Sequence, residues 1–247
     1  MAYQSVFCRY ELKYLLTPAQ KKQMLAAMQP YMKLDDYGRT TIRNLYYDTP
    51  NYRLVRQSLE HPVYKEKLRI RSYAQADTFS PVFVELKKKY DGVVYKRRIA
   101  LPEREAMDRI SGSFPCLRQE QIVREIDYFL EFYGKLRPAA FLSYEREAYY
   151  ALDGSDFRVT FDESILSRQR DLTLCGGVWG TPLLERGQTL MEIKCSGGIP
   201  LWMTEELSQQ KIYKTTFSKY GTAYQTLIFP QTHATNSYHM LEVATNA

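Results

Sequence analysis

The sequence contains no stretch that approaches the roughly 18 consecutive apolar residues of a membrane-spanning helix. Its first residues, Met1 to Arg9, also lack the basic start and long apolar core of a secretory signal. Both absences argue against a membrane-embedded or exported protein. We therefore expect cytoplasmic residence.

Cysteine and histidine are scarce. The chain has four cysteines and three histidines, and no cysteines form the C-x-x-C pair that structural zinc and redox sites use. A Walker A sequence and a kinase glycine-rich loop are absent as well. A zinc site, a dithiol site or a P-loop is therefore not expected, and any metal would need oxygen ligands.

The overall composition is that of a folded protein. Among 247 residues, 34 Lys and Arg face 28 Asp and Glu, which gives a net charge of +6, and 45% of the residues are hydrophobic. No repeat, low-complexity tract or interdomain linker interrupts the chain. We expect one folded domain over residues 1–230 and a polar, disordered tail over 231–247.

Residue periodicity predicts an α+β protein that is rich in strands. Asp91-Gly92 is a strong hairpin signal, and Thr17-Pro18 marks the start of a helix. The predicted strands cover residues 5–16, 40–48, 64–73, 82–90, 93–101, 140–151, 156–162 and 188–195. The predicted helices cover about 18–31, 52–58, 103–111, 118–133, a segment near 200, and 205–213.

At least six of these strands carry charged residues on one face. In 64–73, for example, Lys67, Arg69 and Arg71 alternate with Leu68 and Ile70. One interpretation is a half-buried sheet with a solvated outer face. The other is a barrel with its charges inside, where they must be paired or occupied by a ligand. That ligand would be elongated and highly anionic, such as a polyphosphate or a nucleoside triphosphate, with divalent metals held by acidic residues.

Several segments resemble the VTC domain, the polyphosphate polymerase domain first known from the vacuolar transporter chaperone complex. This family belongs to the CYTH-like superfamily of triphosphate tunnel metalloenzymes. The resemblance covers about residues 5–225, with its motifs in family order. They are RYELKYLL (9–16), LYYDTP (45–50), KLRIR (67–71), VELK (84–87), VYKRR (94–98), YER (144–146), RVTFD (158–162), MEIK (191–194) and FSKY (217–220).

The resemblance implies a closed antiparallel β-barrel, the triphosphate tunnel, with helices packed outside. It assigns catalytic roles to Lys13, Arg146, Arg158 and Lys219. It assigns substrate binding to Lys67, Arg69, Arg71, Lys87, Lys96, Lys194 and Ser218, with Arg98 as an alternative to Lys96. It assigns a Mn²⁺ or Mg²⁺ ion to Glu192, with Glu11 and Glu85 as further ligands or as salt-bridge partners of neighbouring bases. Tyr46, Tyr47 and Tyr144 are further candidates for the tunnel lining.

The function that the resemblance implies is metal-dependent synthesis of inorganic polyphosphate from the γ-phosphate of ATP, with release of ADP. Phosphate or pyrophosphate are further expected ligands. A metal-dependent tri- or polyphosphate hydrolase stays open, as does a non-catalytic sensor of polyphosphate or nucleotides. Nucleic acid is a less fitting partner, because carboxylates inside the groove would repel its phosphates.

Two departures from the family pattern bear on this choice. Classical CYTH triphosphatases carry E-x-E-x-K in the first strand, whereas this chain has Arg9-x-Glu11-x-Lys13. Loss of one acidic residue favours the VTC branch. Thr216 stands where the family often has a base, and Lys214 is a possible substitute. The regulatory SPX domain and the membrane segments of the vacuolar complex are absent from this sequence, so a membrane-protein partner stays open.

Overall fold

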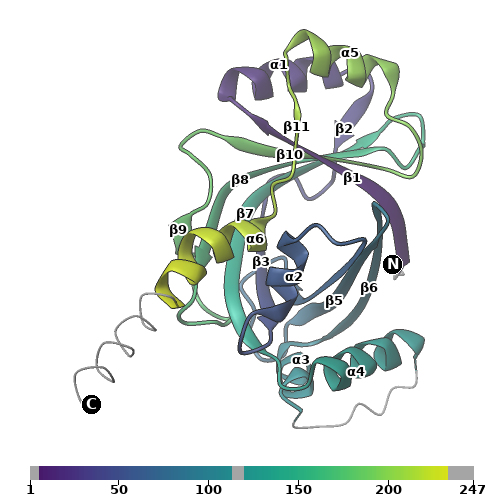
Figure 1. Cartoon of the computed structure of the whole chain (residues 1–247). Coiled ribbons are helices and arrows are strands. Elements are labelled where there is room, and N and C mark those ends of the chain that lie inside the picture. The colour runs from purple at the N-terminus through teal and green to yellow at the C-terminus, as the bar shows by residue number, and fades with distance from the viewer. Residues whose placement is uncertain (1–5, 113–119, 233–247) are drawn as a thin grey trace, which may run out of the picture.

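The computed structural model describes residues 6–112 and 120–232, with side chains from residue 10 onward in the first strand. An antiparallel sheet of eleven strands dominates it, and helices lie on its outer surface (Figure 1). The strands are β1 (Val6–Leu16), β2 (Met32–Leu34), β3 (Thr40–Asp48), β4 (Tyr64–Ser72), β5 (Pro81–Tyr90), β6 (Val93–Pro102), β7 (Arg137–Ala151), β8 (Arg158–Arg168), β9 (Thr181–Pro182), β10 (Thr189–Cys195) and β11 (Lys214–Thr215). The helices are α1 (Pro18–Met28), α2 (Arg53–Leu59), α3 (Glu103–Ile110), α4 (Gln121–Tyr133), α5 (Leu201–Gln209), α6 (Lys219–Ala223) and the π-helical turn η1 (Tyr224–Ile228).

The strand order is β2-β7-β3-β4-β5-β6-β1-β10-β8-β9, with β11 paired to β1. The prediction of an antiparallel sheet with external helices is thus confirmed, but the prediction of a fully closed barrel is wrong. Within the described chain the path has two ends, because the short strands β2 and β9 extend it beyond β7 and β8. An additional pairing of β7 with β8 connects the two long strands next to those ends.

Local sequence signals account for the starts and turns of several elements. Thr17 caps α1 in a capping box with Gln20, and Pro18 occupies its first turn. Between β5 and β6, Asp91 and Gly92 have φ angles of 44° and 81°. Positive φ at both central residues is the geometry of the two-residue hairpin turn that Asp-Gly predicts.

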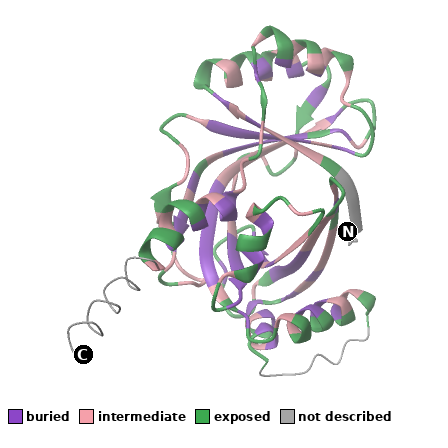
Figure 2. Cartoon of the chain, viewed as in Figure 1, coloured by how far each residue is buried: buried purple, intermediate pink, exposed green. Residues whose placement is uncertain are grey.

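Helices cover the sheet on opposite outer sides. On one side, α3 and α4 pack on the apolar faces of β4 to β6, where Leu68, Val84 and Leu86 meet Ile126. On the other side, α1 and α5 pack on β1, β8 and β10 (Figure 2). Each fully buried aliphatic side chain contributes about 1.5–3 kcal/mol. Because these apolar faces turn outward to the helices, the alternating charged faces turn inward.

A third apolar cluster joins α2, α6 and η1 to β3 and β7. Tyr46 and Val55 pack here with Tyr220 and Tyr224. In Figure 1, α2 and α6 lie beside each other across the opening that the strands surround. They therefore bring the FSKY motif against the interior of the sheet.

The eight predicted strands are confirmed, and the structure corrects three other expectations. The helix from Pro18 ends at Met28, and Met32 begins β2 instead of continuing the helix. The helix expected at 205–213 and the one near 200 are a single helix, α5. Tyr47 lies in the core, where its hydroxyl donates to Met107 Sδ at 3.1 Å, rather than in the cavity.

The expected tail begins at residue 231, but 233–247 lie outside the described residues, so this prediction is untested. None of the helices in the described ranges combines the length and apolar character needed to cross a membrane.

Gly180, which precedes β9, provides a test of the β8–β9 packing. A Cβ at this position would lie 2.6 Å from the backbone oxygen of Ser167, closer than two such atoms can approach. We expect Gly180→Ala to destabilise the fold by about 1–3 kcal/mol, the usual cost of overpacking. Gly177→Ala is the control, because a Cβ there meets nothing within 4 Å. Equal urea midpoints for the two variants would refute the tight packing.

Candidate functional site

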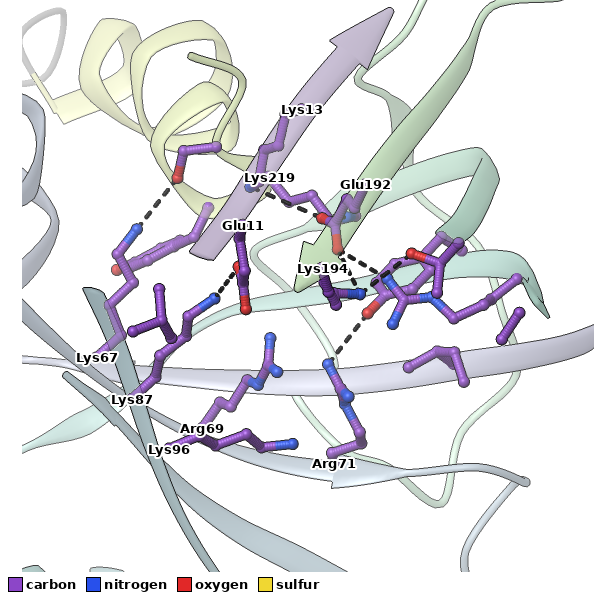
Figure 3. A pocket seen from close by; sticks show the side chains of 18 of the residues that line it. Glu11, Lys13, Lys67, Arg69, Arg71, Lys87, Lys96, Glu192, Lys194 and Lys219 are labelled. Atoms are coloured by element: carbon purple, nitrogen blue, oxygen red, sulfur yellow. Dashed lines mark hydrogen bonds and ion pairs between the residues drawn. The ribbon is translucent and has the colours of Figure 1, made fainter. Parts of the chain in front are cut away.

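The inward faces of the strands enclose a cavity of about 1430 Å³ (Figure 3). Charged side chains from β1, β4, β5, β6, β7, β8, β10 and α6 line it. Thirteen of the fourteen predicted site residues are among them: Glu11, Lys13, Lys67, Arg69, Arg71, Lys87, Lys96, Arg146, Arg158, Glu192, Lys194, Ser218 and Lys219. Alternation had left open whether the charged faces of the strands point to solvent or to the interior. The structure shows that they point to the interior.

Glu192 is the centre of the largest ion-pair network. Its carboxylate lies 2.9 Å from Lys219 Nζ, 3.1 Å from Lys194 Nζ, 3.4 Å from Arg146 Nη2 and 3.7 Å from Lys13 Nζ. Burial would raise the pKa of Glu192, but these four cations hold it well below its usual range. Glu192 is therefore ionised across the whole physiological pH range.

Asp162, which sequence reasoning did not select as a site residue, is the second anion of this network. Its side chain is fully buried and accepts two hydrogen bonds of 2.6 Å from Arg146. Lys219 Nζ lies 2.6 Å from Asp162 Oδ2, the oxygen that also accepts from Arg146 Nη2. The signal was present in the RVTFD motif, where Asp162 shares a face with Arg158. Asp162 fixes two of the predicted catalytic cations in place.

Glu85 is the one predicted site residue that does not line the cavity. It is fully buried and lies 2.8 Å from Arg69, 2.5 Å from Lys96 and 3.8 Å from Arg71. This geometry favours the salt-bridge alternative for Glu85 over metal ligation. The three cations would otherwise repel one another, so Glu85 supports the arrangement of the substrate-binding bases.

The carboxylates that face the cavity suit a divalent metal only in part. Glu11 is paired with Lys87 at 2.6 Å. Burial is the largest influence on its pKa and raises it, but the charges of Lys87, Lys194 and Lys13 together outweigh burial and lower the pKa to about 2. No group of three potential metal-ligating side chains occurs among the described residues. Mg²⁺ and Mn²⁺ accept one or two carboxylates when phosphate oxygens and waters complete the shell. Glu192 and Glu11 fit that mode of binding.

Tyr144 forms the polar floor between the two groups of bases. Its hydroxyl accepts a hydrogen bond of 3.1 Å from Arg71, and its ring lies 4.6 Å from Lys219 Nζ and 5.0 Å from the Arg146 guanidinium. Burial raises the pKa of Tyr144, but Arg146, Arg71 and Lys219 outweigh this and lower it to about 8. The prediction that Tyr46 and Tyr144 line the cavity is confirmed.

The segment before α6 is held by a predicted catalytic residue and a predicted substrate-binding residue. Lys13 Nζ donates to the carbonyl oxygen of Phe217 at 2.9 Å, and Lys67 Nζ donates to Ser218 Oγ at 3.1 Å. The same Ser218 oxygen caps α6 by accepting from Gly221 N. Thr216, which stands where the family often has a base, also lines the cavity, as does the exposed Lys214. Lys214 therefore supplies a base close to Thr216.

A family model described as the VTC domain matches residues 8–228 of this sequence. The chain belongs to the VTC domain family. The match extends over almost all of the described residues and confirms the resemblance drawn from the motifs. No curated protein matches this VTC-domain chain at a significant level.

Solved structures share the fold at low sequence identity. A proposed adenylate cyclase from Bacillus halodurans has a TM-score of 0.54 and 16% identity, with 87% of this chain and 96% of that chain covered. A proposed adenylyl cyclase from Hippeastrum, with a dominant triphosphatase activity, has a TM-score of 0.53 and 18% identity over 88% and 95% of the two chains. At such identity the likeness establishes a shared fold alone.

The crowding of cations around Glu192 generates a prediction about metal binding. We expect the protein alone to retain no Mn²⁺ in equilibrium dialysis, because four cations already surround the carboxylate. With tripolyphosphate present, metal should be retained in stoichiometric amount, and Glu192→Gln should reduce it. Glu125→Gln is the control, because Glu125 pairs with Lys88 and Arg97 outside the cavity. Tight Mn²⁺ retention by the phosphate-free protein would contradict this assignment.

Proposed function

We propose that this VTC domain is a metal-dependent phosphotransferase that extends inorganic polyphosphate with the γ-phosphate of ATP and releases ADP. The family and the tunnel fold support action on triphosphates. The polyphosphate acceptor is part of our proposal. We also propose that the functional unit is residues 1–230, acting in the cytoplasm. A membrane-protein partner could receive the product.

The wall of the cavity supports binding of a long, linear ligand. Pairings run from β7 through β3, β4, β5, β6, β1 and β10 to β8, and β8 pairs with β7. We infer that this last pairing makes the wall continuous around a bound chain. A polyanion inside would meet basic side chains on all sides, at reduced exposure to water, where charge–charge attraction is stronger.

The observation that carries the proposal is a double row of lysines on β4 and β5. Lys65 is directly opposite Lys89, and Lys67 is directly opposite Lys87. Like charges in this register destabilise a sheet. Among the described residues, no carboxylate lies within ion-pair distance of Lys65, Lys67 or Lys89. A polyanion bound against this row would relieve the repulsion between its lysines.

The line of inward-facing bases on β4, which continues from the lysines to Arg69 and Arg71, is also longer than a triphosphate. From Lys65 to Arg71 the inward bases of β4 extend over about 20 Å, at about 3.3 Å per residue. Burial, with the charges of Lys13, Lys87, Lys65 and Arg69, lowers the pKa of Lys67 to about 7. A bound polyphosphate would reverse this shift and keep the amine charged. The lysine row therefore fits a growing chain that passes beyond the reacting phosphates.

The residues can perform the transfer without a covalent intermediate. Phosphoryl transfer needs positioning and charge neutralisation more than a protein nucleophile. Arg69, Arg71 and Arg146 would grip non-bridging oxygens with two N–H groups each. A terminal oxygen of the acceptor phosphate would bond to the γ-phosphorus. The bond from that phosphorus to the β–γ bridging oxygen would break, and its electron pair would leave with ADP.

Lys219 and Lys13 would stabilise the charge that develops on the bridging oxygen. Both amines lie within 4 Å of Glu192 and so face the same point of the cavity. A Mn²⁺ or Mg²⁺ ion held by Glu192 and Glu11 would supply further charge neutralisation when bound. Arg158, which is exposed at the cavity, would contact the nucleotide or the outer phosphates.

The second candidate is a tri- or polyphosphate hydrolase, in which water replaces the phosphate acceptor. The same cations would bind the same phosphates. The lysine row and the loss of the first acidic residue of E-x-E-x-K favour the transferase. A sensor without turnover is the third candidate, and the arrangement of Lys219 beside Glu192 and Asp162 disfavours it.

The test is incubation of the protein with ATP and Mn²⁺ or Mg²⁺, followed by measurement of ADP, free phosphate and polyphosphate. We expect polyphosphate to appear with ADP and to be lost in Glu192→Gln but not in Glu125→Gln. Free phosphate without polymer would assign the hydrolase instead. Binding of ATP with no product of either kind would leave the sensor.

Removal of the outer lysines tests the role of the row. We expect the double variant Lys65→Gln/Lys89→Gln to bind long-chain polyphosphate more weakly. The affinity should fall about tenfold for each lost contact, which corresponds to about 1.4 kcal/mol of binding free energy. Binding of tripolyphosphate should change little, because shorter chains do not reach this end of the row. Lys88→Gln is the control, since Lys88 points to Glu125 outside. Equal losses for both ligands would refute a separate role for Lys65 and Lys89.

A further inference from the structure

The position of Lys219 is not explained by its own helix. Lys219 is the first residue of α6, a helix of five residues. A helix this short has little stability of its own and takes its position from tertiary contacts. Yet Lys219 is only 8% exposed and lies within 3 Å of both Asp162 and Glu192. Contacts elsewhere in the chain must hold α6 in place.

Asp48, in the LYYDTP motif, supplies one such contact. Its carboxylate is fully buried, and the backbone N–H groups of Thr49, Leu54 and Val55 donate to it at 2.8–3.0 Å. These bonds cap the start of α2, where Tyr52 offers no side-chain cap of its own. Asp48 Oδ2 also accepts a hydrogen bond of 2.9 Å from the hydroxyl of Tyr220. Asp48 thus ties α2 to the residue that follows Lys219.

Tyr220 is held on its ring face as well. It stacks on Tyr46 with ring centroids 4.8 Å apart and an interplanar angle of 23°. The Tyr46 hydroxyl in turn accepts a hydrogen bond of 2.8 Å from Arg69. Burial, reinforced by the Asp48 charge, raises the pKa of Tyr220 well above its usual value, so its hydroxyl stays a donor. One motif therefore contacts both the α6 start and a predicted substrate-binding arginine.

We propose that Asp48, acting through the Tyr220 hydroxyl, is a positioning residue that sets the location of the Lys219 amine in the cavity. This inference rests on the proposed function only for the role of Lys219 in turnover. The positioning itself is a property of the fold. It gives the LYYDTP motif a function, because Asp48 and Tyr46 act on a helix 172 residues away in sequence.

The consequence of losing the bond follows from the charges around Lys219. The Lys219 amine lies between Asp162 and Glu192, two carboxylates that repel each other. Burial raises the pKa of Asp162, but the charges of Arg146 and Lys219 outweigh it and keep the pKa below its usual value. If α6 is less firmly held, the amine moves away from this point for part of the time. Transition-state contacts then suffer more than substrate binding, which many other bases share.

The decisive variant is Tyr220→Phe, which removes the hydroxyl and retains the ring that stacks on Tyr46. Tyr133→Phe is its matched control, because the Tyr133 hydroxyl donates to Glu66 at 2.8 Å and lies outside the cavity. The first measurement is the rate of reductive methylation of each lysine amine, which is monitored by mass spectrometry. Lys21, which is ion-paired with Glu147 and Glu163 on the outer surface, is the internal reference for global opening.

We expect Lys219 to be methylated faster in Tyr220→Phe than in the wild type, with the rate at Lys21 unchanged. Tyr133→Phe should change neither rate. The turnover number should fall by about ten- to a hundredfold, the usual cost of misplacing a group by about 1 Å, with KM unchanged. Asp48→Asn should act in the same direction.

Unchanged methylation of Lys219 in Tyr220→Phe would overturn the proposal, whatever the activity. A parallel rise at Lys219 and Lys21 would also overturn it, because it would show general destabilisation. A wild-type protein with no turnover would refute the proposed function alone, and the methylation rates would still decide the positioning role.

Discussion

The structure depends on balancing the positive charge that its strands direct into one cavity. Arg146 and Lys219 lie beside Asp162 and Glu192, and Glu85 lies beside Arg69 and Lys96. Buried cations without partners would cost several kcal/mol each. The carboxylates therefore stabilise the fold even without a ligand. Because they are fewer than the bases, the remaining positive charge attracts a polyanion.

Sequence alternation predicted correctly which residues share a face of each long strand. In β4, Arg69 and Arg71 face the cavity while Leu68 and Ile70 face the helices, because the two-residue period is a local property of any strand. Alternation alone could not decide between an inward and an outward charged face. That decision depends on which face the helices cover, and the family motifs rather than the period indicated it.

The residues that sequence reasoning missed act through distant partners. Asp162 was visible as a strand residue beside Arg158, but its contact with Lys219 joins positions 57 apart, from 162 to 219. Asp48 appeared only as part of a motif, and its partner Tyr220 is still more remote. The short elements β2, β9 and β11 were missed for the same reason. Two or three residues carry too little pattern, and pairing with a long strand creates them.

The ion pairs in the cavity differ in how readily a polyanion could exchange them. Arg146 is held by two bonds to the fully buried Asp162, so it keeps its orientation while its outer edge faces a ligand. Lys87 and Lys67, by contrast, make single contacts with partly exposed partners, which phosphate oxygens could replace. Preorganised charge is most effective where bonds change, because it needs no rearrangement during the reaction. Exchangeable contacts suit a chain that must slide. A fixed centre beside an exchangeable row is thus the arrangement that the proposed repeated transfer to a growing polyphosphate would use.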